Sequence, residues 1–569
     1  MKKNEQGSLT GLFCLLIMTL SSCREQPATV TKEAINDINL KRGDLVLCSP
    51  GDQQLGTISF TTSCSAKTQK DFDLAVALLH SFEYDEAEKV FAKIIDSEPG
   101  CAMAYWGAAM CNYHQVWPSP PTQAELEKGY KAIVIAESIQ QKTKKESDYI
   151  HAMAAFYKEW KTADHRTRTL RFAKAMEELY TADPTDKEAA VFYSLSLVGS
   201  ADPADKSYRN QRKAGELLNA LYLKEPNHPG IVHYIIHSYD YPELAALALP
   251  AARKYASIAP ASAHAQHMPS HIFIRLGLWD ESIQSNLIST SSAKCYAETA
   301  VIKGHWDEEL HGMDYLVYAY LQKAENEKAK EQWDYLKTMN QVYPPNFKVA
   351  YAFAAIPSRY VLENKLWKEA AGLQIHPADF PWKNFPWQKS IYHFTRLLGA
   401  VHIKDLVSAN TELKTLNSLH NELLQQKDDY KANQVLIQVK AGNAWILYAE
   451  GKTREAIELM KEAADMEDKT EKSPVTPGEV LPAKELLADM FLLLNKPAEA
   501  LAAYEEVLLK RPNRFNAVYG AAAAAEKLKQ TEKAMQYYRQ LTTIANAKDS
   551  KRPELETAGK FLKANQSRK

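Results

Sequence analysis

Small and bulky residues recur at fixed spacing along most of the chain. A small residue is followed four positions later by a bulky one, and often by a proline eight positions beyond that. Two complete sets are Ala87, Phe91 and Pro99, and Ala500, Tyr504 and Pro512, and a further pair is Ala534 and Tyr538. A step of four returns to the same face of a helix, and proline ends a helix. The pattern therefore predicts pairs of closely packed helices.

Less regular sets connect these two regions. They are Ala214, Leu218 and Pro226; Ala248, Ala252 and Pro260; Ala329 and Trp333; and Ala370. No single helix pair can bury its apolar stripe alone, so each pair must stack on the next. With 21 glycines in 569 residues and an alanine run from 521 to 525, helices are favoured over sheets. We predict an all-α helix-turn-helix solenoid from about residue 66 onward.

The composition also suggests an internal organisation. Residues 23–65 are predicted to form a tether with two short strands, 45–51 and 56–62. Residues 66–345 form the first part of the solenoid, and 346–472 contain more degenerate helices. The proline-rich break at 473–478 precedes regular repeats that extend to residue 569.

The beginning of the chain has the features of a secretion signal. A positive start is followed by an apolar stretch from Leu9 to Leu20, which is too short to span a bilayer, and by Ser21, Ser22 and Cys23. A cysteine at the cleavage site resembles the bacterial lipobox. That resemblance implies that residues 1–22 are removed, that Cys23 is lipidated, and that Arg24 after it directs the protein to the outer membrane. Its acyl chains would be the only membrane contact.

The overall charge narrows the choice of partners. The chain has 69 Lys and Arg against 70 Asp and Glu, so it lacks the basic excess that nucleic acid binding requires. We therefore expect a protein or peptide partner and no nucleic acid.

The cysteines beyond the signal and the lipidated Cys23 are expected to lie in an oxidising compartment. They are Cys48, Cys64, Cys101, Cys111 and Cys295. Because five is odd, one is left over. A bridge from Cys48 to Cys64 and one from Cys64 to Cys101 are both compatible with the sequence, and Cys111 and Cys295 could equally be small buried apolar residues.

Two histidine pairs repeat with the same offset. His233 and His237 are followed by His267 and His271, and 267 − 233 and 271 − 237 both equal 34. A step of 34 residues is the length of one tetratricopeptide (TPR) unit, so the pairs should occupy equivalent places on consecutive units. His80 and His114 show the same offset of 34.

The resemblance to TPR proteins implies which residues face the concave groove. In the TPR register, inward positions hold two further sets of residues beside the histidine pairs. They are Asp240 and His264, and, after an insertion, His311, Asp314, Tyr318 and Arg359. We predict that His233, His237, His267, His271 and Asp314 bind a metal ion. The predicted ligand contacts are Asp240, His264, His311, Tyr318, Arg359, His80 and His114.

Several histidines with one carboxylate are typical of a transition-metal site. Such a set suits zinc, iron or copper, and an open coordination position would make it catalytic. Two alternatives stay open at this point: an organic or peptide ligand without metal, and histidines that only pack. The glutamate of a His-Glu-x-x-His protease motif is missing from both pairs.

The chain also resembles a narrower group. The strings His233 to His237, His267 to Gly277, Ala102 to Gly107 and Pro474 to Gly478 look like those of long bacterial secreted TPR lipoproteins. This resemblance implies the fold and no particular activity.

Two functions follow as expectations. The first is a membrane-anchored periplasmic TPR scaffold whose groove binds a metal ion or ligand. The alternative is a metal-dependent hydrolase or oxidoreductase that uses the same cluster. The sequence contains no nucleophile elbow, phosphate loop or dinucleotide fingerprint, which favours binding.

Overall fold

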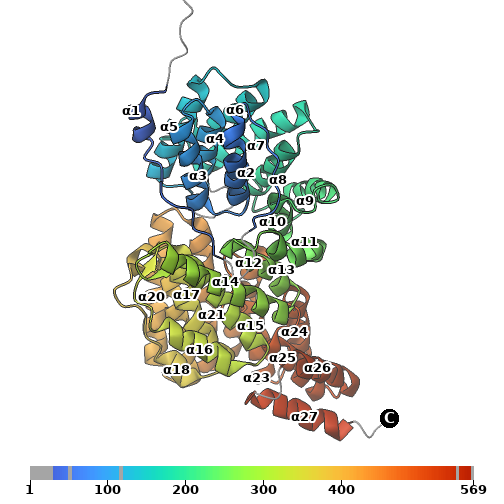
Figure 1. The fold of residues 1–569 in the computed structure, drawn as a ribbon. Helices are drawn as coiled ribbons and strands as arrows, with labels where there is room; N and C mark the ends of the chain where they lie inside the picture. Colours follow the sequence, from blue (N-terminus) through green and yellow to red (C-terminus); the bar gives the residue numbers. More distant parts are fainter. Residues whose placement is uncertain (1–29, 49–53, 114–119, 546–549, 566–569) are drawn as a thin grey trace, which may run out of the picture.

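The protein is built almost entirely of paired helices (Figure 1). The computed structural model describes residues 30–48, 54–113, 120–545 and 550–565. The all-α prediction is confirmed. Among these residues, no helix has both the length and the apolar character needed to cross a membrane.

The first half of the chain forms the upper part of Figure 1 and continues into its centre. Its helices are α1 Lys32–Asp37, α2 Ala66–His80, α3 Tyr84–Ser97, α4 Ala102–Met110, α5 Gln123–Ser138, α6 Lys144–Tyr157, α7 His165–Ala182, α8 Lys187–Gly199, α9 Arg209–Tyr222, α10 Pro229–Tyr239, α11 Ala245–Ile258, α12 Ala263–His267, α13 Pro269–Arg275 and α14 Trp279–Thr299.

The second half completes the solenoid. Its elements are β1 His305–Trp306, α15 Asp307–Gln322, α16 Asn326–Leu336, β2 Val342–Tyr343, α17 Phe347–Glu363, α18 Trp367–Ala371, the 3₁₀ turn η1 Trp382–Asn384, α19 Pro386–His402, α20 Leu406–Gln425, α21 Asp429–Ala449, α22 Thr453–Lys469, α23 Ala483–Leu493, α24 Pro497–Lys510, α25 Phe515–Lys527, α26 Thr531–Ile544 and α27 Pro553–Asn565. The strands β1 and β2 pair in parallel over two residues.

Close contacts between helices explain the small and bulky pattern. A Cβ atom at Gly520 in α25 would lie 2.2 Å from the ring of Tyr504 in α24, and one at Gly107 in α4 would lie 2.2 Å from the ring of Phe91 in α3. Any larger residue would push the two helices apart. Each bulky side chain thus requires a small partner on the next helix, and the pattern sets the packing of the units.

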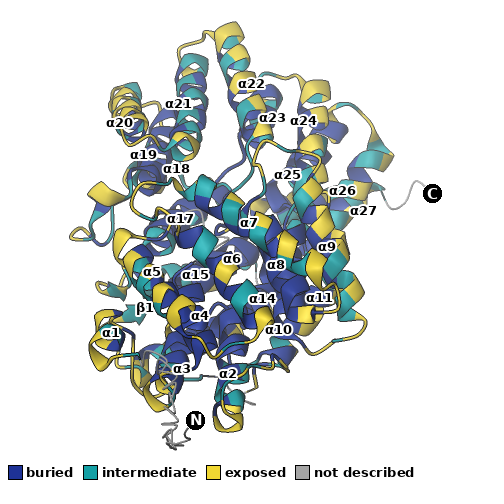
Figure 2. Ribbon diagram, turned by 90° about the horizontal axis from the view of Figure 1, so that it is seen from above, coloured by how far each residue is buried: buried dark blue, intermediate teal, exposed yellow. Residues whose placement is uncertain are grey.

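The solenoid curves until its C-terminal helices contact its middle. The backbone N–H of Phe515 in α25 donates to Oε1 of Gln322 in α15 (2.9 Å), and Nε1 of Trp279 donates to the carbonyl of Asn513 (2.9 Å). In Figure 2, α10 and α15 consist of buried residues, whereas α9 and α20 carry buried, intermediate and exposed residues side by side. The inner helices are therefore enclosed.

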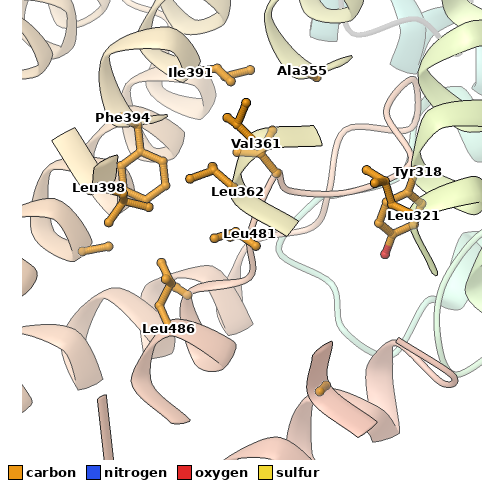
Figure 3. Close-up of a cluster of buried hydrophobic side chains, with 14 of the residues drawn as sticks. Tyr318, Leu321, Ala355, Val361, Leu362, Ile391, Phe394, Leu398, Leu481 and Leu486 are labelled. Carbon is orange, nitrogen blue, oxygen red and sulfur yellow. The ribbon is translucent and has the colours of Figure 1, made fainter. Parts of the chain in front are cut away.

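A segment of the chain itself fills the concave side. Residues 472–481, which we call the strap, connect α22 to α23 and run between the inner helices. The carbonyl of Gly478 accepts from Nη2 of Arg359 (2.6 Å) and from the hydroxyl of Tyr351 (2.9 Å). Figure 3 shows Leu481 among Val361, Leu362 and Leu486. The chain itself therefore occupies the concave groove that the sequence predicted.

The N-terminal segment differs from its prediction. Residues 44–48 and 54–63 are extended, but they form no strands among the described positions. The segment pairs with loops of the solenoid instead, since Thr57 N–H donates to the carbonyl of Asn227 (2.9 Å) and Ala261 N–H to that of Gln54 (3.2 Å). At Gly56, with φ of +81°, a Cβ atom would lie 2.6 Å from the carbonyl oxygen of Asn227. Solenoid loops therefore take the hydrogen bonds that a hairpin would have used.

Two disulfides fasten this segment. Cys64 is bonded to Cys101, which confirms one of the two pairings that the sequence predicted. Cys48 is bonded to Cys295, which lies in α14 and is 247 residues away. Cys111 is free and buried. The alternative bridge between Cys48 and Cys64 was wrong, as was the interpretation of Cys295 as a buried apolar residue.

Candidate metal centre

Six imidazoles form one buried block at the centre of the solenoid. His233 and His237 come from α10, His264 and His267 from α12, His271 from α13, and His311 from α15. All six are at most 9% exposed, and His233 and His267 are fully buried. The sequence predicted that these histidines line the concave groove, and there the strap and the neighbouring helices cover them.

A helix break positions the second pair. Pro269 begins α13 and has no N–H to donate, so α12 ends at His267 and the N–H of His271 bonds the carbonyl of Met268 (3.1 Å). The two side chains still point the same way, because their Nε2 atoms are 3.0 Å apart.

We call His267, His271 and His311 the C-terminal triad. One nitrogen from each ring lies within 4.8 Å of the other two. In two of the rings the outer nitrogen, the one that faces away from the triad, is Nδ1 and already has a hydrogen-bond partner. Nδ1 of His267 is 2.6 Å from Oδ1 of Asn286, and Nδ1 of His271 is 3.1 Å from Oδ2 of Asp240. This is the arrangement found around metal-bound histidines, where a carbonyl or carboxylate holds the outer nitrogen.

These contacts determine where the protons are. Nδ2 of Asn286 donates to the carbonyl of Ser282 (2.8 Å), so the oxygen of that amide faces His267. Since Asn286 Oδ1 and the Asp240 carboxylate can only accept, both rings carry their proton on Nδ1. The two Nε2 atoms that face each other at 3.0 Å therefore both carry lone pairs. A cation between them would turn this repulsion into attraction.

We call His233, His237 and His264 the N-terminal triad. Its three ligand nitrogens also lie within 4.8 Å of one another. Nε2 of His233 is 3.0 Å from Nε2 of His237 and 3.3 Å from Nε2 of His264. Nδ1 of His233 donates to the carbonyl of His80 (2.6 Å), so its Nε2 is an acceptor. The ring of Phe82 covers this triad, with its centroid 4.4 Å from that of His233.

A third cluster has a different chemistry. Glu188 accepts from Nε2 of His80 and from Nε2 of His228, both at 2.9 Å. The other ring nitrogens are also bonded: Nδ1 of His80 is 2.9 Å from the hydroxyl of Tyr234, and Nδ1 of His228 accepts from Ile231 N–H (3.3 Å). Every polar atom is satisfied, so this group holds α2, α8 and α10 together as a structural contact.

Burial favours the uncharged form of five of these imidazoles. It is the largest cause that lowers the pKa of His233, His237, His267 and His311 well below 6.5, and neighbouring imidazoles lower it further. The pKa of His271 is also lowered by burial, although Asp240 opposes this. Neutral imidazole is the form that binds metal ions.

Asp240 connects the C-terminal triad to the strap. Its carboxylate accepts from Nε of Arg275 (2.9 Å) and lies 3.4 Å from Nζ of Lys472, in addition to His271. Burial alone would raise the pKa of this carboxyl, but the charges of Lys472 and Arg275 and the His271 hydrogen bond hold it well below its usual value. Asp240 is therefore an ionised acceptor behind His271.

The remaining predicted residues lie in other places. Asp314, predicted as a metal ligand, is one turn beyond His311 and accepts from Nε of Arg359 (3.1 Å), outside both triads. The guanidinium of Arg359 lies over the ring of Tyr318, 4.9 Å from its centroid. Arg359 and Tyr318 lie on the side of the site where the strap runs, and Arg359 donates to the carbonyl of Gly478 there. His114 and Cys23 lie outside the described residues.

Some participants could not be found from the sequence. Asn286 lies in α14, and the sequence carries no signal that links it to His267. Glu308 lies one turn before His311, and its Oε2 is 4.0 Å from Nδ1 of His264. Tyr315, one turn after His311, has its hydroxyl 3.3 Å from Nε2 of His271. His228 does have a local signal, because it caps α10 directly before Pro229.

Comparison with known proteins identifies the fold. Residues 72–129 and 485–550 match the family model described as Tetratricopeptide repeat, and these stretches fall on helix pairs at the two ends of the solenoid. The chain has a TPR-like fold. No curated protein matches the sequence.

Solved structures of similar type have low identity to this chain. One is the yeast Tom70, with 12% identity and a TM-score of 0.35, where the match covers 88% of this chain and 97% of that one. A second is the Cut9–Hcn1 hetero-tetramer of the APC/C, with 13% identity, a TM-score of 0.30 and coverage of 87% and 89%. A third is Naa15/Naa10 bound to HypK-THB, with 10% identity, a TM-score of 0.24 and coverage of 88% and 97%. Likenesses at this level carry no argument about function.

Proposed function

We propose that this protein is a secreted, lipid-anchored TPR scaffold that holds a divalent transition-metal ion in its C-terminal triad and binds a protein partner. The observation that carries the metal proposal is the pair of facing Nε2 atoms of His267 and His271, 3.0 Å apart. Both outer nitrogens face groups that can only accept. A bound cation gives both lone pairs a partner and leaves the two Nδ1 hydrogen bonds in place, while the hydroxyl of Tyr315 turns from Nε2 of His271 (3.3 Å) to the carbonyl of Val475 (3.4 Å).

The donor set limits the choice of metal. Three imidazoles without a thiolate suit zinc, copper or iron, whereas magnesium and calcium prefer oxygen ligands. The hydroxyl of Tyr315 is close enough to His271 to contact the same ion or its bound water. Complete burial of the triad favours a metal held within the scaffold over turnover of a substrate, so binding is the function that we propose.

The partner surface follows from the fold. The strap fills the concave side, so the proposed protein contact uses the outer helices and the end of the solenoid at α26 and α27, which Figure 1 places away from the centre. TPR folds commonly serve as binding scaffolds, although a fold does not fix its function.

The proposed location rests on the start of the chain. The apolar stretch before Cys23 supports export, and the two disulfides fit an oxidising compartment. Replacing Cys23 by serine should move the protein from the membrane fraction to the soluble fraction in a bacterial host. Unchanged fractionation of Cys23→Ser would contradict the lipid anchor.

Metal content tests the central part of this proposal. The full-length protein, purified without a histidine tag, is analysed by inductively coupled plasma mass spectrometry beside the double variant His267→Ala/His271→Ala. The exposed residue His151 provides a matched control variant, His151→Ala. We expect metal in the parent and the control, and loss of metal from the C-terminal triad in the double variant.

Circular dichroism must show that the double variant keeps its helix content, because the substituted side chains are buried. Absence of metal from the parent after reconstitution with zinc, copper and iron would contradict the metal proposal. It would leave a protein-binding scaffold with a packed histidine core.

A further inference from the structure

We infer that the N-terminal triad is a second metal position, separate from the first, so that the protein holds two transition-metal ions side by side. This inference rests on the proposed function, because it applies the same chemistry to a second set of ligands. The sequence placed all its histidine ligands around a single ion, and the structure divides them into two groups.

Two imidazole nitrogens approach the single lone pair of His233 in the N-terminal triad. Nε2 of His233 is an acceptor, because Nδ1 of that ring donates to the carbonyl of His80. Two further Nε2 atoms, from His237 and His264, point at it from 3.0 and 3.3 Å. An acceptor in the ring plane has one lone pair, so it can take a proton from only one of these neighbours. A metal ion at the centre accepts from all three.

Glu308 adds an independent observation. Its side chain is 9% exposed, and Oε2 has no hydrogen-bond partner among the described residues, although its other oxygen is paired with Lys348. Oε2 faces Nδ1 of His264 at 4.0 Å. Coordination through Nε2 makes Nδ1–H of His264 a stronger donor. A shift of about 1 Å, to an ordinary N–H···O distance, completes this bond and gives the buried carboxylate its partner.

The two triads share their construction. Each contains a pair of histidines four residues apart, and each adds a third ring from another helix. That ring is His264 of α12 in the N-terminal triad and His311 of α15 in the C-terminal triad. In each, the outer nitrogen of one histidine donates to an oxygen that can only accept: the carbonyl of His80 for His233, and Oδ1 of Asn286 for His267. A carboxylate faces a second ring, Glu308 beside His264 and Asp240 beside His271.

The third cluster shows what a satisfied group looks like in the same protein. There the two rings direct Nε2 at the oxygens of Glu188, and no nitrogen faces another nitrogen. Neither triad has a carboxylate in that central place. The comparison separates a structural contact from two candidate ion positions by hydrogen bonding alone.

The two positions are adjacent. The ring centroids of His264 and His267, one from each triad, are 6.5 Å apart, and both rings belong to α12. Nitrogen donors dominate both sites, so the expected ions are zinc or copper. Two such ions in one buried block would make the centre of the solenoid depend on metal.

Native mass spectrometry of the full-length protein reconstituted with zinc counts the ions. We expect two per chain in the parent and in the control His151→Ala. We expect one in His233→Ala/His237→Ala and one in His267→Ala/His271→Ala. For the case in which a double variant does not fold, anomalous diffraction at the zinc edge locates the ions in crystals of the parent itself.

The outcomes separate this inference from the proposed function. One ion in the parent, lost only with His267 and His271, overturns the second position and leaves the first intact. No ion in the parent overturns both. Two ions with one anomalous peak beside each triad support both, and a second peak elsewhere overturns the assignment to the N-terminal triad.

Discussion

The histidine-bearing units from α10 to α15 and the regular units from α23 to α26 solve the same packing problem differently. In the C-terminal units, inner positions hold alanine, glycine and tyrosine, and a small residue receives each bulky ring. In the histidine-bearing units, imidazoles occupy the inner positions, a proline divides one helix into α12 and α13, and α14 extends to 21 residues. The comparison teaches that the regular spacing breaks where imidazoles fill the inner positions, and there the site lies.

The largest expected effect tests the end of the molecule that has no histidines. Arg514 is fully buried and paired with Glu485 (2.7 Å) and Glu363 (2.6 Å). Arg514→Ala leaves two buried carboxylates without their cation and should cost about 3–5 kcal/mol of unfolding free energy. Arg253→Ala, at an exposed pair with Glu281, is the control and should cost about 0–1 kcal/mol.

Urea denaturation measures both variants. The metal content of Arg514→Ala should match that of the parent below its unfolding midpoint, because Arg514 contacts neither triad. Equal stability of the two arginine variants would contradict the view that the ion pairs of Arg514 with Glu485 and Glu363 hold the C-terminal units to α17.

Removing metal should separate the two regions. At a free metal concentration of 100 times Kd, a bound ion stabilises the native state by about 2.7 kcal/mol. After chelation, hydrogen exchange should become faster in α10, α12, α13 and α15 and change little in α24 to α26. Exchange that rises equally in both regions would mean that the ion supports no particular part of the fold.

Asp240→Asn tests the acceptor behind His271. An amide in place of the carboxylate weakens its hold on Nδ1, and metal affinity should fall about 10–100-fold. Asp314→Asn is the matched control, since Asp314 pairs with Arg359 away from the triads. Competition with a fluorescent zinc chelator compares the two, and a similar loss in Asp314→Asn would restore Asp314 as the ligand that the sequence predicted.

The smallest effect concerns pH. Burial lowers the pKa of His233, His237 and His267 in the folded chain, while the same groups in the unfolded chain titrate near 6.5. The unfolded state therefore binds more protons below pH 6.5, and the metal-free protein should lose stability as the pH falls below that value. Residues 473–569 contain no histidine, so this loss should spare the C-terminal units.

Limited proteolysis at pH 7 and at about pH 5.5, one unit below the ordinary histidine value, locates the effect. First cleavage between α10 and α15 at the lower pH agrees with this account. First cleavage between α23 and α27 disagrees with it.

The sequence predicted the helices because their packing rule is local. Ala500 and Tyr504 show it within one turn, and the offset of 34 residues brought His233 and His267 to equivalent places. The long helix α14 and the loop to α15 then shift the register, so that His311 completes the C-terminal triad and Asp314 pairs with Arg359. Counting repeat positions across an insertion cannot show which turn of the following helix faces the site.

Long-range contacts were beyond the sequence for a different reason. Cys48 reaches Cys295 across 247 residues, and Gly478 of the strap meets Arg359 of α17 across 119 residues. Neither partner is marked by spacing or composition. The strap also explains why the predicted groove is a buried centre. The sequence shows the proline-rich break but not where that part of the chain lies in the fold.

X-ray absorption spectroscopy at the metal edge tests the central claim most directly, because it reports the ligands of the bound ion in solution. For the full-length protein purified without a tag, the account predicts a first shell of nitrogen and oxygen at about 2.0–2.1 Å, with the outer-shell scattering of about three imidazoles per ion. A first shell without imidazole scattering, or one containing sulfur, would contradict it.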